Sequence, residues 1–301
     1  MPTSTISLLQ TIEWSKKFNF NRRSALGNYL EPALTNANTV LQTILGAPFA
    51  WRWNRVVTGF ITVQGQQDYY IFNWAANTNV TNGWMLVDSN GNCQTVSTTG
   101  TTDVTMPAWN LTVGGITIDG TAEWTNLGSI TTPVSPTYSF GWIETASVFD
   151  VNTSKWVELE SKICSGLEST QSRPRYIAAQ GDDGSGNISF RLMQVPDAAY
   201  PVAITIQQRP TLFKKLNQTW SPIPDEYSHI YNWGFLALTW LFGDDPRFQL
   251  ANQKFVTSLL SSNEGLDDTE KNIFLGNWQY VTGQPIESIL RMQQGQQARG
   301  V

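Results

Sequence analysis

The chain has 301 residues, of which 41% are hydrophobic and 14% are charged, and its formal net charge is −5. This composition excludes an intrinsically disordered chain, and the net charge gives no reason for the whole chain to bind nucleic acid. Two separated cysteines, Cys93 and Cys164, suit neither a disulfide framework nor a metal site. The first residues lack the order of a signal peptide, and no apolar run has the length of a membrane span, so we expect a soluble chain made in a reducing cytoplasm.

The N-terminal part of the chain has the spacing of helices. Apolar residues recur with a helical period over residues 5–17 and again over residues 24–45. Ser24 is the expected N-cap of the second helix, and Gly46 followed by Pro48 predicts its end.

From Arg55 the pattern predicts β-structure. Residues 56–72 read as two strands joined around Gly65, because β-branched and aromatic residues are enriched there. Residues 75–135 differ from this: they contain almost no basic residues, and turn signals such as Asp119-Gly120 separate short alternating runs. We interpret this segment as a small β module inserted into a host domain.

β character resumes after the insertion, over residues 138–157. A short helix is expected over 156–168. Three strands follow, and the sequence GDDGSG at 181–186 is the expected connection between the first two. The predicted strands are RYIAAQ, GNISFRLM and PVAITIQQRP.

The C-terminal part predicts helices again. Asp225 is the expected N-cap of a long helix that is apolar on all sides, so that this helix must be buried in a bundle or between subunits. Asp244-Asp245 and Pro246 end it, and further helices are expected over 246–262 and 267–280.

These elements predict an α+β fold in which the terminal helices form a helical bundle and a central antiparallel β domain carries the inserted β module. The expected parts are the N-terminal helices at 1–54, the central β domain at 55–74 and 136–210, the inserted module at 75–135, the C-terminal helices at 211–282 and an extended docking tail at 283–301.

The sequence predicts no enzyme, and no catalytic, cofactor-binding or metal-binding residue. The single histidine, His229, has no nucleophile motif near it, so a helix-face or interface role is expected. The doublets Asp182-Asp183, Asp244-Asp245 and Asp267-Asp268 are expected to cap and turn the chain. Asp88 opens a run similar to a calcium loop, but the required glycine and glutamate are absent. A hydrolytic enzyme would need carboxylates from distant loops to meet in a groove lined by tryptophan.

The tryptophans of the inserted segment allow two interpretations. Trp84, Trp109 and Trp124 could form exposed platforms that bind host glycan. Alternatively, they fill the thin core of a small module, which is the interpretation we favour because large rings supply most of the buried area there.

Two stretches resemble phage virion proteins. The sequence PDEYSHIYNWGFLALTWLFGDDPRFQLANQKFVTSLL, preceded by QVPDAAYPVAITIQQRPTLF, is similar to the C-terminal half of head-to-tail adaptors of the connector or tail-tubular family. The N-terminal pattern, which ends in Pro-Phe-x-Trp-x-Trp, is similar to the same group. The sequence PAWNLTVGGITIDGTAEWTNLGSI resembles a small β module of phage structural proteins. The matching residues are Pro107, Trp109, Gly114, Asp119, Gly120, Trp124, Leu127 and Gly128.

The resemblance implies a structural virion protein in the neck or tail, assembled in the host cytoplasm. It would form a closed ring, commonly of twelve subunits, between the portal protein and a downstream tail or nozzle protein, and genomic DNA would pass through the ring without specific binding. A module that binds host glycan or decorates the tail is the alternative. The expected ring interface is Trp233, Leu236 and Trp240, and the expected docking residues of the tail are Ile286, Ile289, Leu290 and Met292.

Overall fold

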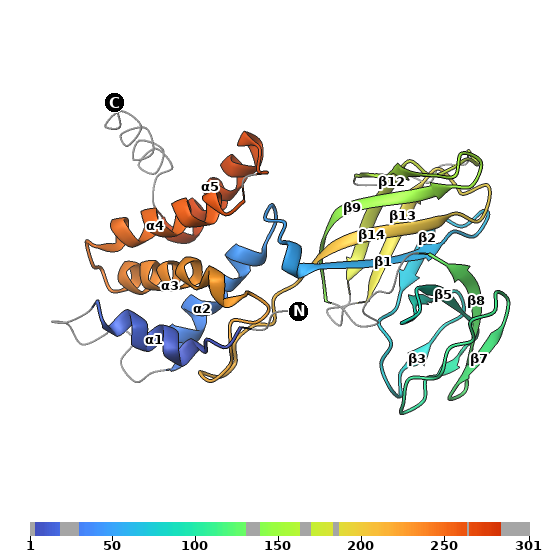
Figure 1. Ribbon diagram of the computed structural model, residues 1–301, viewed down its shortest axis with the longest axis horizontal. Helices are drawn as coiled ribbons and strands as arrows, with labels where there is room; N and C mark the ends of the chain where they lie inside the picture. Colours follow the sequence, from blue (N-terminus) through green and yellow to red (C-terminus); the bar gives the residue numbers. More distant parts are fainter. Residues whose placement is uncertain are drawn as a thin grey trace. The chain divides into compact units, whose positions relative to one another are not determined.

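A computed structural model describes residues 4–18, 30–130, 139–162, 170–182, 187–263 and 265–283. The chain divides into two compact units (Figure 1). A helical unit combines residues 1–54 with 210–301, and a β unit comprises Arg55–Arg209. The α+β fold class predicted from the sequence is confirmed.

The helices begin and end close to where the sequence predicts them, as far as the described residues extend. In chain order they are α1 (Leu8–Lys16), α2 (Leu30–Leu45), the 3-10 helices η1 (Arg52–Asn54) and η2 (Asp225–Tyr227), α3 (Ser228–Phe242), α4 (Phe248–Ser261) and α5 (Asp268–Thr282). Helix α2 ends immediately before Gly46, as predicted, whereas its expected N-cap, Ser24, lies outside the described residues. Asp267 caps α5 through a capping box with Glu270.

Helix α3 lies at the centre of the helical unit, where it contacts α1, α2 and α4 (Figure 1). Its Ile230, Tyr231, Phe235 and Leu238 belong to a large apolar core that also includes residues of α2, α4 and α5. Gly234 allows this close packing, because a Cβ atom there would lie 2.8 Å from the Phe255 ring. The prediction that this helix is buried is therefore confirmed.

The β unit contains two larger sheets and one small sheet. The four-stranded sheet has the order β1 (Arg55–Ile61), β14 (Pro201–Gln208), β9 (Phe140–Asp150) and β10 (Lys155–Glu158). The eight-stranded sheet has the order β11 (Glu160–Ser161), β12 (Tyr176–Asp182), β13 (Ile188–Met193), β2 (Asp68–Ile71), β4 (Met85–Val87), β5 (Asn92–Thr98), β8 (Ala122–Ser129) and β7 (Ile116–Asp119). Strands β3 (Asn79–Val80) and β6 (Gly100–Thr101) pair separately.

The two larger sheets share one apolar core and so form a sandwich. Phe60 of β1 stacks on Tyr69 of β2 with ring centroids 4.3 Å apart, and Val148 of β9 and Phe190 of β13 are fully buried in the same core. Although β1 and β2 are consecutive, they lie in different sheets. The connection between them therefore crosses from one layer of the sandwich to the other.

Two sequence predictions about the β unit need correction. Trp156 and Val157 lie in β10, and Glu160 and Ser161 form β11, so the short helix expected over 156–168 is wrong for these residues. Pairing of β10 with β9 outweighs the local preference for helix. The sheets are also not purely antiparallel, because β2 pairs with β4 and β11 pairs with β12 in parallel.

The strands of the predicted insertion continue the sheet of the host domain. Strands β4, β5, β8 and β7 extend the eight-stranded sheet beyond β2. On one face, Met85 and Cys93 enter the core of the sandwich. A second, smaller core includes Phe72, Trp109 and Trp124. The segment therefore has a core of its own and also shares the core of its host.

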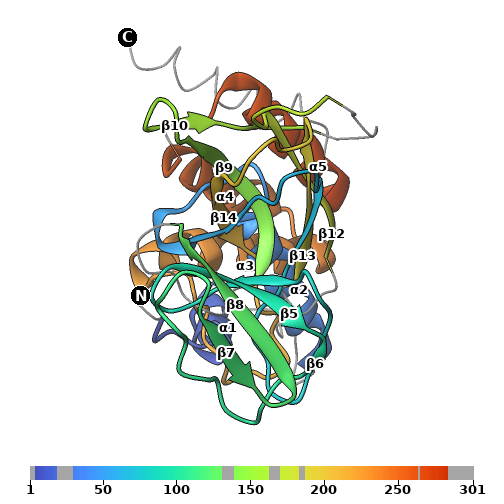
Figure 2. The ribbon, with the colours of Figure 1, turned by 90° about the vertical axis from the view of Figure 1, so that its right-hand side faces the viewer.

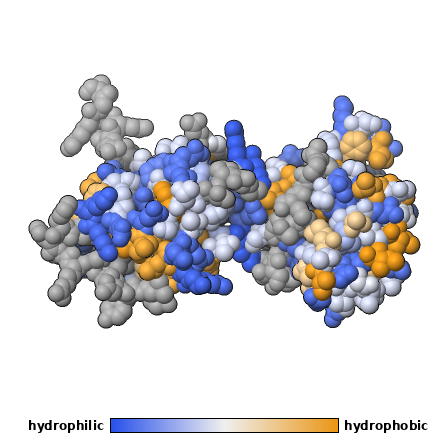
Figure 3. All heavy atoms as spheres, turned by 60° about the horizontal axis from the view of Figure 1, so that its bottom comes forward, coloured by the Kyte–Doolittle hydropathy of each residue, from blue (hydrophilic) through white to orange (hydrophobic). Residues whose placement is uncertain are grey.

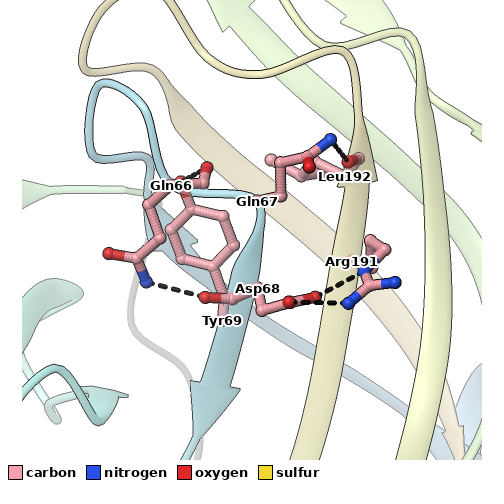
Figure 4. Close-up of polar contacts among 6 residues, drawn as sticks. All are labelled: Gln66, Gln67, Asp68, Tyr69, Arg191 and Leu192. Atoms are coloured by element: carbon pink, nitrogen blue, oxygen red, sulfur yellow. Dashed lines mark hydrogen bonds and ion pairs between the residues drawn. The ribbon is translucent and has the colours of Figure 1, made fainter. Parts of the chain in front are cut away.

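Polar contacts fix the connection between β1 and β2 (Figure 4). The Tyr69 hydroxyl donates to the Gln66 carbonyl at 2.8 Å and accepts from the Val63 amide at 3.1 Å. Beside it, Arg191 of β13 donates twice to the Asp68 carboxylate, at 2.6 and 2.7 Å. The loop is thus held from its buried side by a hydroxyl and from its exposed side by an ion pair.

Candidate interaction surfaces

The residues predicted for a ring interface lie in an aromatic cluster of the helical unit. Leu236 is fully buried, Trp240 is 5% exposed and Trp233 is partly buried. The cluster also contains Trp14 and Phe18, and the Trp14 and Trp233 rings meet edge to face at 5.4 Å. Leu236 and Trp240 therefore have packing partners inside the subunit, and their role in a ring stays a prediction.

Two cations cover the outer side of this aromatic cluster. The Lys254 ammonium lies 4.2 Å from the centroid of the Trp233 ring, and the Arg247 guanidinium lies 4.6 Å from that of Trp240. Arg247 also pairs with Asp245 at 2.7 Å and donates to the Phe18 carbonyl. The Asp245 partner raises the pKa of Arg247. The rim of the cluster is consequently charged rather than apolar.

Other apolar side chains of the helical unit are exposed, and the sequence analysis did not select them as interface residues. Tyr280 is 92% exposed, and Phe242, Leu250 and Ile273 are each more than half exposed. Ile273 and Tyr280 are seven positions apart on α5 and so occupy one face of the helix. This seven-residue spacing is the sequence signal that could have identified the exposed apolar face of α5. The predicted docking residues Ile286, Ile289, Leu290 and Met292 lie outside the described residues.

Asp225 does not cap its own helix, which corrects the sequence prediction. Its carboxylate accepts from the hydroxyls of Ser4 and Thr5 at 2.8 and 2.6 Å and from the Thr5 amide at 3.1 Å. These bonds, first the one from the Thr5 hydroxyl and then the one from Ser4, lower the pKa of Asp225. The carboxylate thus attaches the N-terminal segment, which lies far away in the sequence, to the start of η2.

His229, the histidine considered for catalysis, lies in the first turn of α3. His229 is exposed, and its Nδ1 lies 3.1 Å from the Glu226 carbonyl. Among the described residues, no group of three or more histidine, cysteine and acidic side chains could hold a metal ion. Burial raises the pKa of the Cys93 thiol to about 12, so this thiol is poorly reactive.

A groove of about 560 Å³ lies between β9 and β12 in the β unit and contains Trp142, Lys162 and Gln180. Lys162 pairs with Glu160 at 2.6 Å and lies over the Tyr176 ring. No carboxylate is among the described residues that line the groove, so these residues do not supply the acid pair that glycoside hydrolysis needs.

The tryptophans proposed as glycan platforms are in the small core of the β unit. Trp124 is fully buried, Trp109 is 8% exposed, and their rings meet edge to face at 5.6 Å. The indole N–H groups of Trp74 and Trp124 both donate to the Asp119 carboxylate, at 2.9 and 3.2 Å. Trp109 and Trp124 therefore fill the core, as the favoured interpretation predicted, whereas Trp84 is partly buried and packs against it.

Comparison of the chain with protein-family models, with curated proteins and with solved structures gave no match. Within the described residues, no helix combines the length and the apolar character that a membrane crossing requires.

Proposed function

We propose that the protein is a structural subunit of a bacteriophage particle, a head-to-tail adaptor whose helical unit assembles into a ring between the portal and the tail. In this proposal the helices from the two ends of the chain form the bundle that makes the ring wall. The observation that carries the proposal is that the helical stretches similar to connector proteins, the N-terminal pattern and residues 224–260, come together in one compact unit with α3 at its centre, whereas the strand that precedes them, β14, lies in the β unit.

The exposed side chains of α5 support assembly through the helical unit. Ile273 and Tyr280 present apolar surface to the outside on one helix face. A ring repeats one heterologous contact many times, so that a modest patch is sufficient for each interface. The variants Ile273→Asp and Tyr280→Asp should therefore reduce assembly, whereas Thr257→Asp, at an exposed position of α4, should not.

The experiment that tests the proposal is co-sedimentation with the portal protein of the same phage. The full-length chain should sediment with portal. A chain that ends at Gly283 should fold, as measured by circular dichroism, but should no longer sediment with portal, because it lacks Ile286, Ile289, Leu290 and Met292. Normal co-sedimentation of the truncated chain would contradict the docking role of the tail. Failure of the full-length chain to bind portal would contradict the adaptor function.

A further inference from the structure

Strand β7 turns its apolar side chains outward. Ile116 and Ile118 are 56% and 72% exposed, whereas Thr117 and Asp119 between and beside them are buried. A strand with one face on a core normally has the reverse pattern. The sequence of β7 is therefore arranged for contacts on its outer face.

Polar contacts on the inner face fix this orientation. The Asp119 carboxylate accepts from the Asp103 amide at 2.8 Å in addition to the indoles of Trp74 and Trp124. The Thr117 hydroxyl accepts from the Asn110 amide at 2.9 Å. A shift by one residue would bury the isoleucines but would break all of these bonds. The exposure of Ile116 and Ile118 is consequently built into the register.

Neighbouring residues extend the exposed face into a surface. Ile116 lies opposite Thr125 of β8, and Ile118 lies opposite Glu123, so each pair shares one face of the sheet. Val113 is 69% exposed, and its Cγ2 would lie 3.6 Å from a Cβ atom at Gly128 of β8. We call Val113, Ile116, Ile118, Glu123 and Thr125 the β7 surface.

The β7 surface borders a sheet edge to which no further strand pairs among the described residues, although the Asn110 side-chain amide donates to the Ile116 carbonyl at 3.4 Å. Strand β7 is the last strand of the eight-stranded sheet, and within the described residues only β8 pairs with it (Figure 2). Proteins commonly protect such edges with lysine or proline, but no lysine, arginine or histidine occurs in residues 75–135. Apolar side chains are visible on the surface of the β unit (Figure 3).

The charged residues of the segment that carries the β7 surface, residues 75–130, are all acidic, and they select its partner. Of the acidic residues in 75–130, Asp88 and Asp119 are buried, whereas Asp103 is exposed and Glu123 is partly exposed. Glu123 lies on the surface itself, and Asp103 precedes Val104, which is 65% exposed. A second copy would place carboxylates against carboxylates, and an anionic membrane would be repelled.

We propose that the β7 edge binds an extended segment of a partner protein that adds a strand to the sheet. Alternate apolar residues of this segment contact Ile116 and Ile118, and a lysine or arginine pairs with Glu123. Backbone hydrogen bonds to the open edge give affinity, and the side chains give specificity. The proposal concerns the β unit alone and does not depend on ring formation by the helical unit.

The probe for this proposal is a labelled peptide with the sequence Lys-Thr-Val-Thr-Val-Thr-Lys, whose lysines and valines share one face of an extended strand, and fluorescence anisotropy measures its binding to the full-length chain. The peptide should bind and should slow hydrogen exchange of the backbone amides of residues 116–119. The double variant Ile116→Thr/Ile118→Thr should weaken binding at least about tenfold, because two buried apolar contacts are lost. Its unchanged melting temperature would show that it folds. The matched control is Val151→Thr, at an exposed position elsewhere in the β unit.

Three results would overturn the proposal. The first is absence of binding, or equal binding by the double variant. The second is equal binding of a peptide in which glutamate replaces both lysines, which would show that the negative charge of Glu123 does not select the partner. The third is self-association of the chain, or binding to vesicles of anionic lipid, that the double variant abolishes, since the surface would then bind a second copy or a membrane.

Discussion

Helix α3 and strand β7 place their apolar residues in opposite ways. In α3, Leu236 and Trp240 look suited to an interface because the helix is apolar on all sides, yet both are buried inside the subunit. In β7, Ile116 and Ile118 alternate with polar residues as in an ordinary core strand, yet both are exposed. This difference shows that, in β7, hydrogen bonds from polar side chains to buried partners decide which apolar side chains lie on the surface. Asp119 accepts hydrogen bonds from buried donors, whereas Leu236 and Trp240 pack into an aromatic cluster with Trp14 and Phe18.

The largest expected effect is that of Asp119→Ala on the β unit. The variant leaves two indole N–H groups and one amide without an acceptor, which should lower the free energy of unfolding by roughly 3 to 5 kcal/mol. Thermal unfolding followed by near-ultraviolet circular dichroism measures the loss. Asp103→Ala is the control, because its carboxylate is exposed and, among the described residues, accepts from the adjacent Val104 amide alone. Equal stability of the two variants would show that Asp119 does not fix β7.

The second prediction tests whether Leu236 of α3 stabilises the core of the subunit or acts at a ring interface. Leu236→Ala should destabilise the helical unit of the monomeric chain by about 3 kcal/mol, because it leaves a cavity in a packed cluster. Phe242→Ala, at a 68% exposed position of the same helix, should change stability far less. Denaturant unfolding of the monomeric chain measures both. If Leu236→Ala left unfolding unchanged but prevented assembly, the leucine would act at the ring interface.

The contacts of the β1–β2 connection predict two smaller and unequal losses in the free energy of unfolding. Tyr69→Phe removes a buried hydroxyl that bonds to Val63 and Gln66, at an expected loss of about 1.5 kcal/mol. Asp68→Asn weakens an exposed ion pair with Arg191 and should change the stability by under about 0.5 kcal/mol. Urea unfolding of each variant measures these changes. A larger loss for Asp68→Asn than for Tyr69→Phe would reverse the ranking of the two contacts.

An effect smaller than that of Tyr69→Phe concerns the acid stability of the helical unit. Hydrogen bonds lower the pKa of Asp225 in the folded chain, so its contribution is present above the ordinary aspartate pKa of about 3.9. That contribution is lost as the pH falls through the lowered folded pKa. Asp225→Asn should cost about 1 kcal/mol near neutral pH and should flatten the dependence of stability on pH below about 4. An unchanged acid profile in the variant would contradict this role.

Local signals predicted local structure well. Asp267 caps α5 because its partner Glu270 is three positions away, and the Asp119-Gly120 signal lies at the turn between β7 and β8. Gly120 has a φ of +64°, which only glycine adopts easily, and a Cβ atom there would lie 2.3 Å from the Thr101 carbonyl oxygen. These residues of the phage-like β motif therefore have structural roles within the described fold.

Contacts distant in sequence could not be predicted. The capping role expected for Asp225 was wrong because its partner Ser4 is 221 positions away. Trp156 joined a strand because β9 was available to pair with it. The outward direction of Ile116 and Ile118 followed from bonds to Asp103 and Trp74, which no periodicity reveals.

The mass and symmetry of the purified chain, measured by native mass spectrometry with negative-stain imaging, alone and mixed with portal, test the proposed function most directly. The proposal predicts a closed ring, or a monomer that forms a ring on the portal. It also predicts that the assemblies of the Tyr280→Asp variant have a lower mass, because fewer subunits associate. A chain that remains monomeric in both conditions, at every concentration tested, would contradict assembly through the helical unit.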